Sequence, residues 1–124
     1  MTMNKEFVTY EQALALRKLG FYEQCFGGFA KDDKTLYIGY DAEFGEHFFR
    51  DFYIPAPLKQ QVFRWFREKY DWYLDLGHSE RVDFYYAILK NSEPFEWRND
   101  YSTYEEAENA CIDKLIEIAK QQDK

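Results

Sequence analysis

The most regular pattern in this sequence is an apolar stripe at helical spacing near its C-terminal end. The stripe consists of Tyr104, Ala107, Cys111, Leu115 and Ile118, and Ile112, Ile116 and Ala119 widen it. Two overlapping capping boxes stand in front of it, Ser102 with Glu105 and Thr103 with Glu106. The segment is therefore predicted to be an amphipathic helix that begins after Ser102 or Thr103 and covers a core.

Two further helices are predicted upstream. Thr9 and Gln12 form a capping box before an apolar run that Gly20 is well placed to end. The other helix follows Pro55-Ala56-Pro57, with Pro57 at or near its first position. Its apolar residues fall within an arc of about 160° on a helical wheel. These residues are Leu58, Val62, Phe63, Trp65, Phe66 and Tyr70.

Several short strands lie between the helices. Residues 25–30 and 35–40 are predicted to form a hairpin around the polar turn at 31–34. The Gly27-Gly28 pair indicates a bulge or a close backbone contact. Further strands are predicted at 72–76, 81–90 and 95–98, with turns at 77–80 and 91–94. Residues 41–54 are read as an acidic loop that runs into a short extended segment.

The order of these elements, α-β-β-α-β-β-β-α, indicates an α+β fold. We expect an antiparallel sheet of four to five strands, with about three helices packed mainly on one face. A chain of 124 residues fits one domain, so residues 1–124 are predicted to form a single globular unit.

Aromatic residues are unusually frequent, with 12 Phe, 11 Tyr and 3 Trp making up 21% of the chain. Each such side chain buries about 150–250 Å² when it is covered, so a small domain cannot cover all of them. Most are expected to build the core. Several tyrosines and some Phe or Trp rings are expected at the surface or along a groove, which is also compatible with a homodimer.

The net charge of −7 bears on the class of partner. An acidic surface repels phosphate, which disfavours binding to nucleic acid and to anionic membranes. No stretch approaches the roughly 20 apolar residues of a membrane span, and the N-terminus has no apolar run. We therefore expect a cytoplasmic protein in which Cys25 and Cys111 are reduced and behave as small buried hydrophobes.

Residues for catalysis or metal binding do not form a recognisable set. His47 lies near Asp41, Glu43 and Glu46, but the spacing matches no common metal site, and whether these residues form any site stays open. No serine sits in a nucleophile elbow. A pair among the 23 acidic residues could still act as general acid and base. The sequence favours a non-enzymatic protein without metal or cofactor.

The strongest candidates for binding lie on the second helix. Residues 50–70 carry five basic residues against two acidic ones, in a chain that is otherwise strongly acidic. The candidate contact residues are Lys59, Arg64, Trp65 and Arg67, although Trp65 falls inside the apolar arc, where packing in the core is the more common role. Arginines beside aromatic residues are typical of protein interfaces, so a protein partner is the preferred interpretation.

A small anionic ligand, such as a nucleotide held in an aromatic and arginine pocket, is the alternative. The two interpretations differ in geometry. Convergence of Arg64 and Arg67 on a concave pocket would favour the anionic ligand, and a flat face would favour the protein partner.

Two segments resemble a known group of sequences. They are Ile54-Pro55-Ala56-Pro57 with the following Gln60 to Lys69 segment, and Thr103 to Ile118. Both are similar to segments of small proteins, without a known activity, that phages and mobile elements of Bacteroides-type bacteria carry. The resemblance implies a small accessory protein that works in a bacterial cytoplasm by binding host components. It implies no catalytic residue, ligand or cofactor.

Overall fold

The computed structural model describes residues 3–23, 25–38, 53–79 and 83–122. A short 3₁₀ helix, Met3–Glu6, precedes the first α-helix. The described residues contain three α-helices and two three-stranded antiparallel sheets. The helices are α1 (Tyr10–Lys18), α3 (Lys59–Tyr70) and α4 (Tyr104–Gln122). The strands are β1 (Gly27–Ala30), β2 (Leu36–Ile38), β3 (Tyr53–Ala56), β4 (Tyr73–His78), β5 (Phe84–Lys90) and β6 (Glu93–Tyr101).

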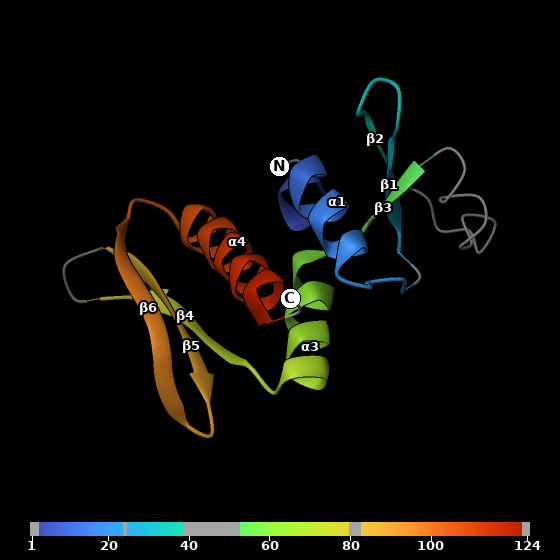
Figure 1. The fold of residues 1–124 in the computed structure, drawn as a ribbon. Helices are drawn as coiled ribbons and strands as arrows, with labels where there is room; N and C mark the ends of the chain where they lie inside the picture. Colours follow the sequence, from blue (N-terminus) through green and yellow to red (C-terminus); the bar gives the residue numbers. More distant parts are fainter. Residues whose placement is uncertain (1–2, 24, 39–52, 80–82, 123–124) are drawn as a thin grey trace.

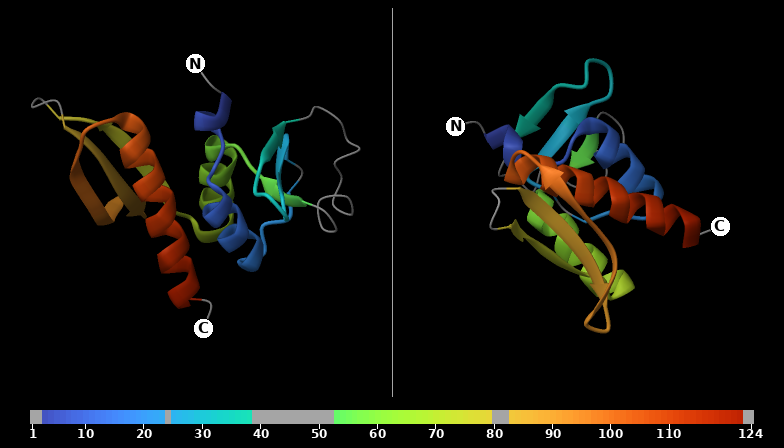
Figure 2. Two further views of the ribbon diagram at one scale, coloured as in Figure 1. Left: turned by 90° about the horizontal axis from the view of Figure 1, so that it is seen from above. Right: turned by 90° about the vertical axis from the view of Figure 1, so that its left-hand side faces the viewer.

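The elements form three layers, with the helices between the two sheets (Figures 1 and 2). One sheet has the strand order β2-β1-β3 and the other β4-β5-β6. The α+β class is confirmed. The prediction of one sheet of four to five strands, with the helices mainly on one face, is wrong, because the strands divide into two sheets on opposite sides of the helical layer (Figure 2).

The second sheet arises because the Pro55-Ala56 segment is a strand, not the start of a helix. In β3, Pro55 pairs with Gly28 and Ala56 with Gly27 of β1. Proline has no N–H to donate, and β3 is an edge strand where one such donor is dispensable. The helix begins only at Lys59, so Pro57 lies before its first position.

Helix α1 begins and ends as its sequence predicts. Thr9 Oγ1 accepts a hydrogen bond from the N–H of Gln12 at 3.1 Å, and Gln12 Oε1 accepts one from the N–H of Thr9 at 2.9 Å. This reciprocal capping box satisfies two donors that a helix start would leave unpaired. Gly20, with φ of 101°, follows the helix end in a conformation that favours glycine.

The apolar face of α3 forms an aromatic cluster in the core. Val62, Phe63, Trp65 and Phe66 are buried, as the helical wheel indicates. Trp72, just beyond the helix, stacks on Tyr70 with ring centroids 4.5 Å apart. The helix ends at Asp71 in a left-handed conformation. The aromatic surplus of the sequence is thus partly used to fill the space between α3 and the β4-β5-β6 sheet.

Helix α4 is the centre of the molecule and packs against α1, α3 and the β4-β5-β6 sheet. Thr103 rather than Ser102 caps it, since Thr103 Oγ1 accepts a hydrogen bond from the N–H of Glu106 at 3.1 Å. Its buried face matches the predicted stripe, with two exceptions. Ile118 is only partly buried. Tyr104, in the first turn, is 37% exposed.

The hairpins are longer or shorter than their sequence patterns indicate. Strands β1 and β2 form the predicted hairpin with a turn at residues 31–34. Strand β4 continues to His78, and β6 spans Glu93–Tyr101, so the predicted turns at 77–80 and 91–94 are too long. Only Asn91 and Ser92 separate β5 from β6. The predicted acidic loop lies largely in residues 39–52, outside the described residues.

Among the helices that the structure describes, none combines the length and the apolar character needed to cross a membrane.

Candidate functional site

The four residues predicted for binding point in different directions from α3. Lys59 is 4% exposed and Trp65 is 8% exposed, so both belong to the interior. Arg64 and Arg67 are exposed, as their positions on the polar side of the wheel predict. The structure therefore does not bring the predicted set together on one surface.

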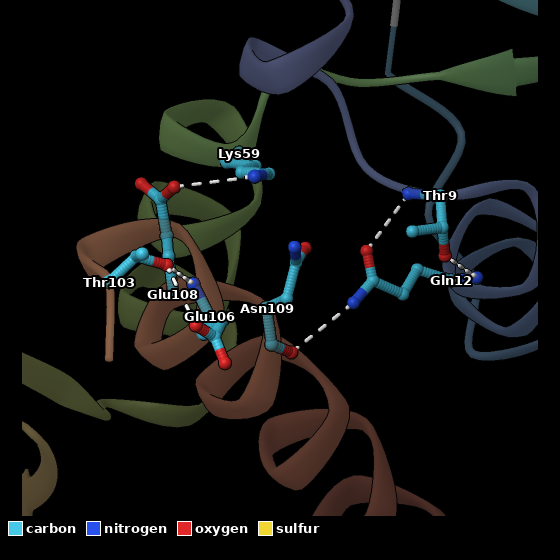
Figure 3. A network of polar contacts seen from close by, with 7 residues as sticks. All are labelled: Thr9, Gln12, Lys59, Thr103, Glu106, Glu108 and Asn109. Atoms are coloured by element: carbon cyan, nitrogen blue, oxygen red, sulfur yellow. Dashed lines mark hydrogen bonds and ion pairs between the residues drawn. The ribbon is translucent and has the colours of Figure 1, made fainter. Parts of the chain in front are cut away.

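Lys59 lies in a buried ion pair between two helices. Its Nζ is 3.4 Å from Oε1 of Glu108 on α4 (Figure 3). Burial raises the pKa of the Glu108 carboxyl, and the nearby Lys59 opposes this shift. A cation enclosed in this way holds α3 to α4 rather than meeting a partner at the surface.

Trp65 packs in the core, which is the alternative that its place in the apolar arc indicates. Its ring makes an edge contact with Phe21, with centroids 5.4 Å apart. Lys69 Nζ lies 4.8 Å from the Trp65 ring centre and donates a hydrogen bond to the carbonyl oxygen of Leu19 at 3.0 Å. These contacts join the C-terminal end of α3 to that of α1.

Arg64 faces the connection between α1 and β1. Its Nη2 is 3.9 Å from Oε1 of Glu23, and Gln61 Nε2 donates to the same oxygen at 3.4 Å. The side chain of Arg64 is more than half exposed, so water screens this pair.

Arg67 faces a hollow of about 280 Å³ between α3 and β4. Gln60, Phe63 and Arg67, spaced by three and four positions, form its α3 wall. Trp72, Tyr73, Leu74 and Leu76 come from β4 and the residue before it, and Tyr104 comes from the first turn of α4. None of these lining residues is acidic, which is unusual in a chain with a net charge of −7.

The hollow has a rigid floor and two accessible aromatic side chains at its rim. Phe63 and Trp72 are buried beneath it, and Trp72 stacks on Tyr70. Tyr73 is 49% exposed and Tyr104 is 37% exposed. Partial burial and the nearby Glu108 raise the pKa of Tyr104, so its hydroxyl stays protonated and can donate or accept a hydrogen bond.

A second concave surface lies at the N-terminal ends of α1 and α3. It encloses about 520 Å³ and is lined by three lysines and one acid, together with apolar and aromatic residues. The charged residues are Lys5, Lys34, Lys59 and Glu105. Lys34 Nζ lies 5.0 Å from the ring centre of Tyr10, which also lines the cavity.

A polar network joins the start of α1 to α4 (Figure 3), and two of its members, Thr9 and Asn109, line this second cavity. Gln12 Nε2 donates to the carbonyl oxygen of Asn109 at 3.3 Å and to Asp113 Oδ1 at 3.0 Å. The side-chain oxygen of Asn109 is buried and has no hydrogen-bond partner among the described residues.

The titratable groups of the described residues do not form a reactive set. Burial raises the pKa of Cys25 to about 12 and also raises the pKa of Cys111, so both thiols stay protonated and are poor nucleophiles. No group of three His, Cys, Asp or Glu residues within the described ranges could hold a metal ion. The predicted Asp41, Glu43, Glu46 and His47 set lies outside those ranges.

Sequence reasoning found Arg67 but missed the tyrosines beside it. Tyr73 has a strand position beyond the end of α3, and only the pairing of β4 with β5 shows which way it faces. Tyr104 fits the apolar stripe of α4 by spacing, and its place in the first turn leaves it half covered. The place of Gln60 beside Arg67 could have been predicted from the sequence, because helical spacing puts both residues on one face of α3.

The comparisons with known proteins assign no family to this chain. No family model matches it, and neither the curated proteins nor the solved structures include a significant match.

Proposed function

We propose that this chain is a non-enzymatic accessory protein, of the phage or mobile-element type, that binds a protein partner in a bacterial cytoplasm. The hollow between α3 and β4 is the proposed contact surface. One observation supports this most strongly: the exposed Arg67 lies beside the exposed Tyr73 and Tyr104, with no acidic residue among the side chains that line the hollow.

Arginine and tyrosine are the residue types that most often carry the binding energy of protein interfaces. The buried Phe63 and Trp72 hold the floor of the hollow in place, so little side-chain entropy is lost when a partner covers it. Arg67 can donate two parallel hydrogen bonds to one carboxylate, and the tyrosine hydroxyls can pair with main-chain groups.

The net charge of the whole molecule also influences which proteins can bind. A net charge of −7 attracts basic proteins over a distance of about 10 Å at moderate salt. The expected partner is therefore basic overall and presents a carboxylate or a main-chain carbonyl to Arg67.

The test compares Arg67→Ala with Arg64→Ala. The two variants remove the same charge from neighbouring turns of α3, but Arg64 faces Glu23 and lies outside the hollow. A partner captured from bacterial lysate by the wild type and identified by mass spectrometry is then purified. We expect Arg67→Ala to weaken its affinity at least about tenfold and Arg64→Ala to leave it nearly unchanged.

Tyr73→Ala provides an independent variant in the same hollow, on a different element. A partner that binds all three variants as tightly as the wild type would contradict the proposed surface. If no protein is retained above background, the proposal of a protein partner fails.

Binding of a small anionic ligand is the second candidate function. It is favoured by the second cavity, at the N-terminal ends of α1 and α3, which three lysines line and which is called the lysine-lined cavity below. Lys5 and Lys34 are exposed at its rim, and the helix dipole adds partial positive charge at the start of α1. Arg64 and Arg67 do not converge on a pocket, so the ligand would rest on lysines rather than on the predicted arginines. Lys59 is already paired with Glu108.

Native mass spectrometry of the purified protein tests this second function. A fixed added mass, lost in a Lys5→Ala/Lys34→Ala variant, would support an anionic ligand in this cavity. The matched control is Lys114→Ala/Lys120→Ala, which removes the same charge from α4 away from the lysine-lined cavity. Loss of the added mass in both double variants would indicate unspecific attraction.

A further inference from the structure

Strand β6 has an edge that no other described strand covers. It is the last strand in the order β4-β5-β6 and pairs on one side with β5. With nine residues it is the longest strand in the described part of the chain. At its middle lies Trp97, which is 64% exposed. A long strand edge with an exposed tryptophan is a surface to which another strand can add.

The register with β5 determines which way the side chains of β6 face. Arg98 pairs with Tyr86, Trp97 with Ala87, and Glu96 with Ile88. Tyr86 and Ile88 are buried against the helical layer. Because directly opposite residues share a face of the sheet, Glu96 and Arg98 lie on the helix side of the edge, and Trp97 lies on the outer side.

We propose that two copies of this chain associate through β6, with the two strands antiparallel and Trp97 of one copy opposite Trp97 of the other. In this arrangement Glu96 of each copy is opposite Arg98 of the other copy. The dimer then contains two identical pairs of opposite charge on one face and a pair of tryptophans on the other. The two sheets become one continuous six-stranded sheet around a two-fold axis.

The charges select this register over its neighbours. Since opposite residues share a face, the strands can slide only in steps of two residues. A slide in one direction places Glu96 opposite Glu96, and a slide in the other places Arg98 opposite Arg98. Like charges that face each other across strands are destabilising. Neither Glu96 nor Arg98 forms an ion pair with another described residue, so both side chains are available.

The irregularities of β6 favour a short, self-complementary occupant over a long foreign strand. The register with β5 shifts near both ends, between Ile88 and Leu89 and between Phe84 and Tyr86. Asp100 has a φ of 77°, and Pro94 lacks an N–H. Only Glu96, Trp97 and Arg98 pair with β5 in one unbroken register, because Phe95 and the Asn99-Asp100 pair stand at the two shifts. The regular part of the edge is therefore the Glu96-Trp97-Arg98 triplet.

Helix α4 covers the sheet from one side, with β5 as its main contact, and β6 forms the edge (Figures 1 and 2). The hollow that contains Arg67 and Tyr73 lies beside β4, at the opposite edge of the same sheet. Self-association therefore leaves that hollow open, and this inference does not depend on the proposed protein partner.

The test is charge reversal measured by sedimentation velocity up to about 1 mM protein, the weak end of the affinity scale. We expect the wild type to dimerise. Glu96→Arg alone and Arg98→Glu alone each replace both opposite-charge pairs by like-charge pairs, so each is expected to raise the dimer dissociation constant at least about tenfold.

Two combinations are expected to restore the dimer. In the double variant Glu96→Arg/Arg98→Glu, opposite charges face each other again. In an equimolar mixture of the two single variants, one copy carries two arginines and the other two glutamates, so a heterodimer forms. Its formation also shows that both single variants are folded.

Glu93→Arg is the matched control, because it makes the same charge change on β6 outside the regular segment. In the proposed register Glu93 lies opposite Tyr101, so this variant is expected to dimerise like the wild type. A wild type that stays monomeric at every concentration overturns the proposal. So does a mixture of the single variants that stays monomeric, or a Glu93→Arg variant as impaired as Glu96→Arg.

Discussion

The Nζ of Lys59 lies 3.4 Å from Oε1 of Glu108, and these side chains are only 5% and 10% exposed. The pair joins the first turn of α3 to α4. Transfer of two charges from water into the interior costs several kcal/mol for each ion, and their attraction must offset that cost. The raised pKa of Glu108 is consistent with this balance, since burial outweighs the effect of its cationic neighbour.

Removal of one member of this pair is expected to be far worse than removal of both. Lys59→Met leaves the Glu108 carboxylate buried without its cation and should lower the free energy of unfolding by about 3 kcal/mol. The double variant Lys59→Met/Glu108→Leu replaces the ions with apolar groups of similar size and should fall within about 1 kcal/mol of the wild type. Urea denaturation followed by circular dichroism measures both values.

Equal losses for the single and the double variant would show that packing around Lys59, and not the unpaired charge, is the source of the effect. Lys114 with Glu117 provides a comparison on the surface, where the Nζ to Oε2 distance is 3.1 Å. Lys114→Met should change the free energy of unfolding by less than about 0.5 kcal/mol, because solvent screens an exposed pair.

The raised pKa of Glu108 also predicts how stability changes with pH. The folded state holds the Glu108 proton more tightly than the unfolded state does. The resulting stabilisation is complete below the ordinary carboxyl pKa and is lost as the pH rises through the higher pKa of the folded state. In the variant Lys59→Met/Glu108→Gln neither group titrates in this range.

We therefore expect the wild type to lose stability relative to that double variant as the pH is raised from about 4 to about 7. Urea midpoints at several pH values provide the measurement. A difference that stays constant, or that grows in favour of the wild type, would show that Glu108 keeps an ordinary or a lowered pKa.

The close approach between Phe7 and β1 predicts a cost for a single methyl group. A Cβ atom added at Gly27 would lie 2.9 Å from Cε1 of the buried Phe7 ring. The ring cannot move freely in a packed core, so Gly27→Ala should lower the free energy of unfolding by about 1–3 kcal/mol. Thermal and urea denaturation of the purified variant provide the value.

Gly77→Ala is the control for this prediction. At Gly77 the added Cβ would lie 3.1 Å from the hydroxyl oxygen of Tyr85, which is the far end of a side chain near the surface. Tyr85 can shift, so a change below about 0.5 kcal/mol is expected. Similar losses at both positions would mean that strand position, and not the contact with Phe7, determines the cost.

The parts of the fold that depend on local chemistry could be predicted from the sequence. Thr9 with Gln12, and Thr103 with Glu106, form capping contacts within four residues, and both are present. The buried faces of α3 and α4 follow from spacing for the same reason. For the Gly27-Gly28 pair the sequence left open a bulge or a close backbone contact. The structure has the close contact at Gly27, and the sequence did not indicate its partner, Phe7.

The number of sheets could not be predicted in this way. The separate β2-β1-β3 sheet depends on the pairing of β1 with β3, which are far apart in the sequence. No local pattern reports such a pairing, and Pro55 and Pro57 favoured a helix start. The prolines instead occupy an edge strand and the residues just before the helix.

The candidate site likewise depends on contacts between residues that are far apart in the sequence, which local patterns do not indicate. A helical wheel counts Lys59 as polar and therefore exposed, and only the approach of Glu108 from α4 explains why it is buried. Arg67 was correctly expected to be exposed. Its neighbours Tyr73 and Tyr104 come from two other elements, so no spacing within one helix could indicate that hollow.

The turn between β5 and β6 predicts a substitution that stabilises the protein. Asn91 and Ser92 have φ values of 56° and 66°, and Lys90 pairs with Glu93 across them. A two-residue hairpin turn with two positive φ angles prefers asparagine followed by glycine. Serine at the second position is strained at a positive φ, and glycine is not. The free energy gained by relief of this strain exceeds the cost of the extra conformational entropy that glycine loses on folding.

Ser92→Gly should therefore raise the free energy of unfolding by about 0.5 kcal/mol, measured by urea denaturation. Ser79→Gly is the comparison, because Ser79 does not have a positive φ and glycine there relieves no backbone strain. That variant should be destabilised by about 0.5 kcal/mol. If Ser92→Gly is destabilised to the same degree as Ser79→Gly, the strain at this turn is smaller than the backbone angles indicate.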